Sequence, residues 1–229
     1  MRSIFASVGL ALGLVGFTAQ QASAFPITYE FSGTGSGAIG GRSFADALVV
    51  FSGTADTDKV VPLTFTELPG LTFYAVALDG LAVSIAGIGT ATLTDPAEVF
   101  SFPQAIIDPD GEIPPLPGLI LGRIDHPPAL DSWTGMAAVF SDSLDGYDLK
   151  TSKGPITDFG GVGFIEGCGT PGHDPCLGTS LGPLSFTTNI LGEKGGTFTA
   201  TAVPEPSTLL FMSGGLVALV RRTRRGRRG

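Results

Sequence analysis

The sequence has few charged residues, and very few basic ones outside its last positions. Charged side chains make up 15% of the 229 residues, against about 25% in average soluble domains. Six of the 13 Lys and Arg residues lie in the last nine positions, and residues 25–203 hold six basic residues against 20 acidic ones. Because phosphate binding needs a basic patch, we expect no nucleic-acid partner. Divalent cations, or solubility alone, fit this acidic segment better.

Histidine is scarce as well, since His126 and His173 are the only two. Residues 178–182 match the nucleophile elbow G-x-S-x-G, which needs a catalytic His later in the chain, but none follows Ser180. Residues 35–40 match the dinucleotide fingerprint G-x-G-x-x-G, but a chain with 34 glycines contains such matches by chance, and no βαβ pattern follows. We therefore predict a Gly-rich loop at 178–182, no dinucleotide cofactor, and a protein that is not an enzyme.

Helical periodicity is rare, whereas turn-forming residues are abundant, with 34 Gly and 17 Pro. Residues 27–31 and 81–85 alternate large apolar side chains with smaller or polar ones, which places the large ones on one face of a strand. The Pro-rich residues 103–117 are expected to form a loop, because each Pro removes a ladder donor. We predict an all-β domain over residues 25–203, a two-sheet β-sandwich resembling a jelly roll. Further strands are expected at 47–51, 71–76, 90–94, 99–102, 119–124, 137–140, 162–165, 184–188 and 197–201.

Residues 1–24 have the pattern of a secretory signal peptide. A positive start at Arg2 is followed by the apolar residues 4–17, and Ala22 and Ala24 occupy the −3 and −1 positions of a cleavage site. An uncleaved membrane anchor is the alternative, but this run is shorter than the roughly 20 residues that span a bilayer. We expect cleavage after Ala24, so that the mature chain begins at Phe25.

Residues 204–229 combine three features in a fixed order. First come Pro204, Glu205 and Pro206, whose prolines favour an extended backbone. An apolar run over 209–220 follows, which we expect to enter the bilayer as a transmembrane helix. Residues 207–220 give only about 21 Å as a helix, against about 30 Å of hydrocarbon. Either snorkelling arginines make up the difference, or the segment lies tilted and partly in the interface. The last feature is an arginine cluster that would hold the end on the cytoplasmic side, including Arg221, Arg222, Arg224 and Arg225.

These three parts, together with the signal peptide, resemble the PEP-CTERM sorting domain of Gram-negative bacteria. The resemblance implies that Pro204, Glu205 and Pro206 form the motif recognised by an exosortase, a membrane-embedded cysteine protease or transpeptidase. It also implies transient anchoring in the membrane, followed by delivery to the cell surface or beyond. Residues 29–35 and 51–57 are similar to the N-terminal regions of a set of PEP-CTERM proteins, which implies a common sandwich but no characterised activity.

Cys168 and Cys176 are the only cysteines, and they enclose a Gly- and Pro-rich turn. In an oxidising compartment such a pair most often forms a disulfide, which we expect here. The alternative is a zinc site that adds His173 and Asp174 as ligands, although a second pair of ligands is missing.

We expect no cofactor other than calcium, for which two acidic loops are weak candidates. One contains Asp108 and Asp110, and the other contains Asp142, Asp145 and Asp148. Carboxylates near a Gly turn suit a hard cation, but neither loop matches the EF-hand spacing. A solvated acidic turn is the alternative.

The first functional hypothesis is a non-catalytic envelope or extracellular-matrix protein, which an exosortase processes and delivers to the surface or to exopolysaccharide. The second is a carbohydrate-binding or calcium-dependent lectin-like module. Exposed aromatic side chains on one sheet face would favour the second, and Trp133 and Tyr147 are the candidates. A hydrolase is disfavoured by the shortage of His.

Overall fold

The fold is all-β, as the sequence predicts. The computed structural model describes residues 25–64, 70–102, 116–124, 133–163, 177–187 and 194–204. Within these ranges there are twelve strands and two short 3-10 helices, and strands make up 67% of the residues. The strands are β1 (Pro26–Ile39), β2 (Arg42–Asp56), β3 (Val61–Leu63), β4 (Phe73–Ala77), β5 (Asp79–Ile85), β6 (Gly89–Thr92), β7 (Glu98–Phe102), β8 (Gly118–Ile124), β9 (Trp133–Phe140), β10 (Lys153–Val162), β11 (Leu184–Phe186) and β12 (Lys194–Ala202), and the 3-10 helices are η1 (Thr57–Lys59) and η2 (Asp142–Leu144).

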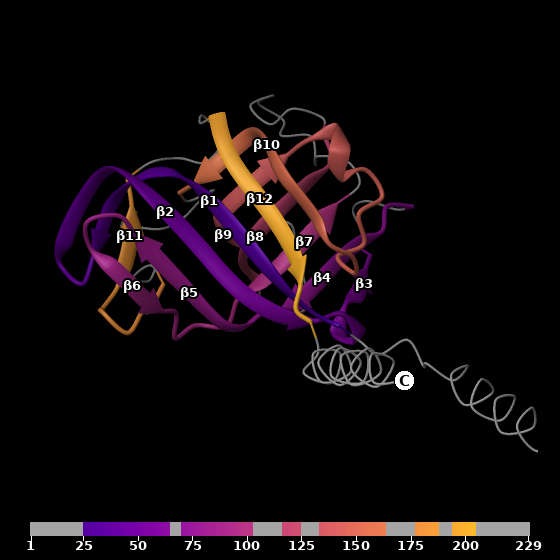
Figure 1. Cartoon of the computed structure of the whole chain (residues 1–229), viewed down its shortest axis with the longest axis horizontal. Helices are drawn as coiled ribbons and strands as arrows, with labels where there is room; N and C mark the ends of the chain where they lie inside the picture. Colours follow the sequence, from indigo (N-terminus) through magenta and orange to yellow (C-terminus); the bar gives the residue numbers. More distant parts are fainter. Residues whose placement is uncertain are drawn as a thin grey trace, which may run out of the picture.

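All twelve strands belong to one antiparallel sheet (Figure 1). Its order is β3-β4-β7-β8-β9-β10-β12-β1-β2-β5-β6, and β11 pairs with β1 beside this path. Strand β10 explains why there is one sheet: Lys153 to Phe159 pair with β12, whereas Phe159 to Val162 pair with β9. A single sheet therefore replaces the two-sheet jelly roll that we expected, because β10 bridges what would have been two separate sheets.

The sheet folds over so that its two halves share one core. One half of the sheet contains β4 and β7, and the other contains β2 and β5. Only Leu78 separates β4 from β5, yet β4 pairs with β7 and β5 pairs with β2. The chain therefore turns from one layer into the other at Leu78, as it does at the corners of sandwiches. Phe51 of β2, Val83 of β5 and Leu119 of β8 belong to the same buried cluster. The architecture is sandwich-like, although the layers are continuous.

Strand β1 shows how the alternating pattern builds this core. Ile27, Tyr29 and Phe31 are each 1% exposed, whereas Glu30 between them is exposed. This confirms the alternation predicted for 27–31. Burying such side chains contributes about 1.5–3 kcal/mol each, which stabilises the inward orientation of the strand.

Strand β1 extends well beyond the predicted segment, through its Gly-rich second half. A Cβ atom on Gly37 would lie 2.0 Å from the carbonyl oxygen of Ser185, so the close approach of β11 requires glycine there. Gly40 and Gly41, with φ of 55° and 79°, form the turn into β2. Residues 35–40 thus belong to a strand and a hairpin turn, and not to the strand-to-helix turn that a dinucleotide fingerprint occupies.

Most of the other predicted strands are confirmed within a few residues. Residues 153–161 of β10 were not predicted to form a strand. The strand expected at 162–165 meets β10 only at Val162, and residues 164 and 165 lie outside the described residues. Residues 178–182 form the expected loop, in which Thr179 makes an isolated bridge with Leu93. Of the predicted Pro-rich loop, residues 103–115 lie outside the described residues.

Candidate functional site

The end of β12 is the one described part of the chain that reaches the predicted processing motif. β12 runs antiparallel to β1, with Ala202 opposite Ile27. The backbone N–H of Val203 donates a hydrogen bond of 2.8 Å to the carbonyl oxygen of Pro26. On the other side, the backbone N–H of Ala202 donates to Oγ of Ser152 at 3.0 Å. The last strand is therefore held on both sides up to Val203.

Pro204 is exposed and follows this held segment directly. Pro204 is the only residue of the predicted tripeptide that the structure describes, because Glu205 and Pro206 lie outside the described residues. Two peptide units join Val203 to Glu205, so their Cα atoms lie at most about 7 Å apart even in a fully extended chain. The folded domain thus ends immediately before the motif.

The first residues of the expected mature chain lie beside this exit. Phe25 precedes β1 and is 45% exposed. Since Pro26 accepts from Val203, the start of β1 and the end of β12 are neighbours at the same end of the sheet, and the two strands run side by side (Figure 1). Phe25 and Pro204, which bound the described domain, therefore lie at the same end of it.

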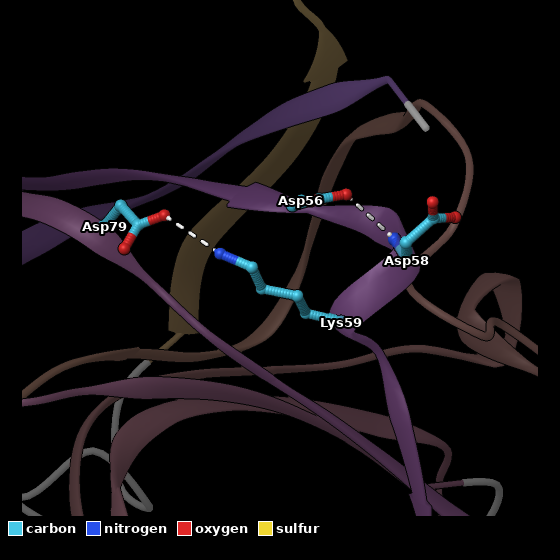
Figure 2. A network of polar contacts seen from close by, with 4 residues as sticks. All are labelled: Asp56, Asp58, Lys59 and Asp79. Atoms are coloured by element: carbon cyan, nitrogen blue, oxygen red, sulfur yellow. Dashed lines mark hydrogen bonds and ion pairs between the residues drawn. The ribbon is translucent and has the colours of Figure 1, made fainter. Parts of the chain in front are cut away.

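The end of β2 brings acidic side chains to this same region, because Asp56 lies opposite Pro26 in the sheet. Oδ1 of Asp56 accepts the backbone N–H of Asp58 at 3.0 Å and caps η1 (Figure 2). Nζ of Lys59 lies 3.9 Å from Oδ2 of Asp79, and both side chains are mostly exposed. An exposed pair of this kind contributes at most about 1 kcal/mol. This arrangement is a solvated turn with an excess of negative charge.

The segment that carries Ser152 is fixed from inside the domain by two tyrosines. The hydroxyl of Tyr29 donates to the carbonyl oxygen of Leu149, and the hydroxyl of Tyr147 donates to that of Thr151 at 2.8 Å. Burial, with a smaller effect of the nearby Asp148 carboxylate, raises the pKa of Tyr29 well above its usual 10.0. Burial likewise raises the pKa of Tyr147, helped by Tyr29 and Asp148. Both phenols therefore stay protonated and keep donating at neutral pH.

The position of Tyr147 corrects one prediction. Tyr147 is only 5% exposed, and its ring centroid lies 6.0 Å from that of Phe198. It packs in the core because the carbonyl of Thr151 satisfies its hydroxyl, so it does not present an aromatic platform to a sugar. The side chain of Trp133, the other candidate, lies outside the described residues.

The three aspartates of the second calcium candidate loop are not gathered into one group in the structure. Asp142 and Asp145 are exposed, and Oδ1 of Asp148 accepts the backbone N–H of Lys150 at 3.1 Å. Among the residues that the structure describes, no group of three or more His, Cys, Asp or Glu side chains is placed to hold a metal ion. Asp108 and Asp110, the first candidates, lie outside those residues.

Several other predicted residues also lie outside the described ranges. Within the described ranges, no helix is both long enough and apolar enough to cross a membrane. The predicted residues that fall outside are Ala24, Cys168, His173, Asp174, Cys176, Arg221, Arg222, Arg224 and Arg225.

Sequence reasoning missed Pro26 and Ser152 as partners of the strand that leads to the motif. The contact with Pro26 depends on the register of β1 and β12, and the contact with Ser152 joins positions 50 residues apart. The alternating patterns of β1 and β12, at the two ends of the domain sequence, were a signal for the contact with Pro26. No sequence signal distinguishes Ser152 from other loop serines.

Comparison with known proteins supports the assignment of the tail. The family model for the PEP-CTERM protein-sorting motif matches residues 202–225, which include the last residue of β12 and the predicted tripeptide. No curated protein and no solved structure matches the chain. A PEP-CTERM motif indicates an exported protein that an exosortase, a membrane enzyme, sorts and processes.

Proposed function

We propose that this chain is a non-catalytic envelope or extracellular-matrix protein, which is held transiently in the membrane by its tail and released by an exosortase. The single observation that carries the proposal is the sorting motif at residues 202–225. Its finer part, a structural or adhesive role at the cell surface or in exopolysaccharide, rests on the acidic, strand-rich domain that precedes the motif.

The geometry at the end of β12 is compatible with this order of events. Six residues separate Ala202 from Leu209, where the apolar run begins. At full extension this connection reaches at most about 25 Å. If the run enters the bilayer, the end of the domain that carries Phe25 and Pro204 stays close to the membrane surface. The motif then lies between the folded domain and the lipid, where a membrane enzyme operates.

Two features support a role without catalysis. The segments that resemble catalytic or cofactor motifs are a hairpin and a tight loop. In that loop the hydroxyl of Thr179 donates to the carbonyl oxygen of Gly182, and the backbone N–H of Gly182 donates to the carbonyl oxygen of Thr179 at 3.0 Å. This compact turn lacks the helix that follows a nucleophile elbow, so Ser180 is not placed as such a nucleophile.

The proposal predicts that Pro204-Glu205-Pro206 is needed for release. Replacing the three residues with Ala should leave the precursor in the membrane fraction. The apolar run still anchors the chain, but the exosortase no longer has a motif to recognise. The measurement is a fractionation blot of wild type and variant, in a host with and without its exosortase. Phe25→Ala is the control, since Phe25 lies beside the exit but outside the motif. The proposal is contradicted if the triple variant matures at the wild-type rate. It is also contradicted if the wild-type protein matures equally fast in a host without the exosortase.

A binding test addresses the finer role. The mature protein is incubated with the exopolysaccharide of its host, with and without calcium, and the bound fraction is measured by co-sedimentation. Retention without calcium supports a matrix protein, and retention only with calcium supports the lectin-like alternative. No retention in either condition contradicts exopolysaccharide as the partner.

A further inference from the structure

We infer that Ser152 is a positioning residue for processing: its hydroxyl latches the end of β12, and release of this latch limits access to the Pro-Glu-Pro motif. The inference rests on the proposed function and adds a determinant of its rate. It concerns the backbone that immediately precedes the motif, rather than the motif itself.

The motif follows the folded strand so closely that an enzyme must contact both. A protease or transpeptidase binds its substrate as an extended strand over several residues, because backbone hydrogen bonds and side-chain pockets both need that conformation. Here the residues before Pro204 are already a strand, but their backbone is paired within the domain. Only about 7 Å of chain separates Val203 from Glu205. An enzyme that contacts two or three residues before the motif competes with the sheet for them.

Two hydrogen bonds must break before the end of β12 can leave the sheet. Val203 is held by the carbonyl of Pro26, and Ala202 is held by Oγ of Ser152. Ala202 is exposed and Val203 is half-buried, so little apolar surface resists their release. At this end of β12 the two hydrogen bonds are therefore the principal restraint. Losing one neutral hydrogen bond raises the population of a released strand end by about fivefold.

The backbone that carries Ser152 is held in place on its N-terminal side. Two carbonyls before Ser152, those of Leu149 and Thr151, accept hydrogen bonds from the buried phenols of Tyr29 and Tyr147. Lys153 begins β10 and lies opposite Ala200 of β12. The hydroxyl of Ser152 thus lies on a fixed backbone. It contacts β12 two residues beyond Ala200, the last residue of β12 that pairs with β10.

The experiment measures how fast the full-length precursor matures, by pulse-chase labelling in the exosortase-containing host. Ser152→Ala removes the acceptor and should accelerate maturation by about threefold to fivefold. Ser152→Thr retains a hydroxyl and should restore the wild-type rate. Ser143→Ala is the matched control, because its exposed hydroxyl contacts only Ser141 among the contacts described for it, and the rate should not change.

A second variant tests the mechanism by separating the motif from the fold. Six Gly and Ser residues inserted between Val203 and Pro204 should accelerate maturation in the wild-type background. In the same chain Ser152→Ala should then have no further effect, because the enzyme no longer needs the end of β12. A merely structural role for Ser152 would change the rate equally with and without the insertion, and this outcome would overturn the inference.

The failures of the inference and of the proposed function are distinguishable. If the Ala-Ala-Ala variant and loss of the exosortase both block maturation, the proposed function stands whatever Ser152 does. If maturation then proceeds at the wild-type rate in Ser152→Ala, or if the insertion slows it, the latch is refuted. Limited proteolysis of the same precursors is the check on folding, and accelerated digestion of the whole domain in Ser152→Ala would also refute a local latch.

Discussion

Phe198 of β12 is the side chain whose removal should damage the domain most clearly. It is completely buried, and its ring centroid lies 5.0 Å from that of Phe31, 6.0 Å from that of Tyr147 and 6.4 Å from that of Tyr29. Phe198→Ala removes a ring that joins β12 to β1 and to the segment before β10. Large-to-small changes of this kind cost about 3–5 kcal/mol.

The upper part of this range applies, because three aromatic neighbours lose a partner and each pair contributes about 0.5–1.5 kcal/mol beyond burial. A domain of ordinary stability has only about 5–15 kcal/mol in total. We therefore expect Phe198→Ala to remove a large part of the free energy of unfolding. Urea unfolding of the mature protein, followed by circular dichroism, measures the change.

Phe25→Ala is the matched control, since the same ring is lost from a site that is 45% exposed. It should change the free energy of unfolding by about 0.5 kcal/mol or less. A loss below about 1.5 kcal/mol for Phe198→Ala, or equal losses for the two variants, would show that this aromatic cluster does not stabilise the fold as argued.

Two further predictions concern protonation and oxidation. Because the pKa values of Tyr29 and Tyr147 are raised above 10.0 in the fold, these two phenols should not change the free energy of unfolding well below pH 10. Above pH 10 each should lower it by up to about 1.4 kcal/mol per pH unit, which urea titrations at pH 8, 10 and 11 measure. Tyr147→Phe should roughly halve this slope, and an unchanged slope would contradict the burial argument. Cys168 and Cys176 should be joined in the exported protein, so that alkylation without reductant adds no label in an intact-mass measurement, whereas thiols protected only until a chelator is added would indicate zinc instead.

The parts of the fold that were predictable are those in which one strand carries its own pattern. The buried face of β1 is predicted by large apolar residues at every second position, namely Ile27, Tyr29 and Phe31. The strand at 81–85 has the same pattern. The tail was also predictable, because its order of motif, apolar run and arginines is contiguous in sequence. In both cases the signal lies within a few neighbouring residues.

Strand β10 was not predictable, because its pairing decides its conformation. Gly154, Pro155 and Gly160 oppose a regular strand in isolation. In the sheet, Gly160 has a φ of 122°, and a Cβ atom there would lie 2.2 Å from the carbonyl oxygen of Ala138. The contact with β9 thus requires glycine at position 160, and this contact cannot be read from the sequence. The single sheet follows from this same strand.

The candidate site divides in the same way. Pro204 could be found from the motif, whereas Ser152 could not, because its role depends on lying beside Ala202 in the folded sheet. Tyr147 was misplaced for a related reason. A tyrosine has both an apolar ring and a hydroxyl, and only the fold shows that a backbone carbonyl is available to satisfy that hydroxyl in the core.

The position of β12 within the sheet matters for what release leaves behind. β12 lies between β10 and β1, so its ladder is satisfied on both sides up to Val203. Processing at or beyond Pro204 removes no hydrogen bond of this ladder, and re-forming the contacts to Pro26 and Ser152 restores the end of the strand. A tail leaving from an edge strand such as β3 would have only one neighbour to hold it. The central position therefore allows the end of the strand to open for an enzyme while the core around Phe198 stays closed.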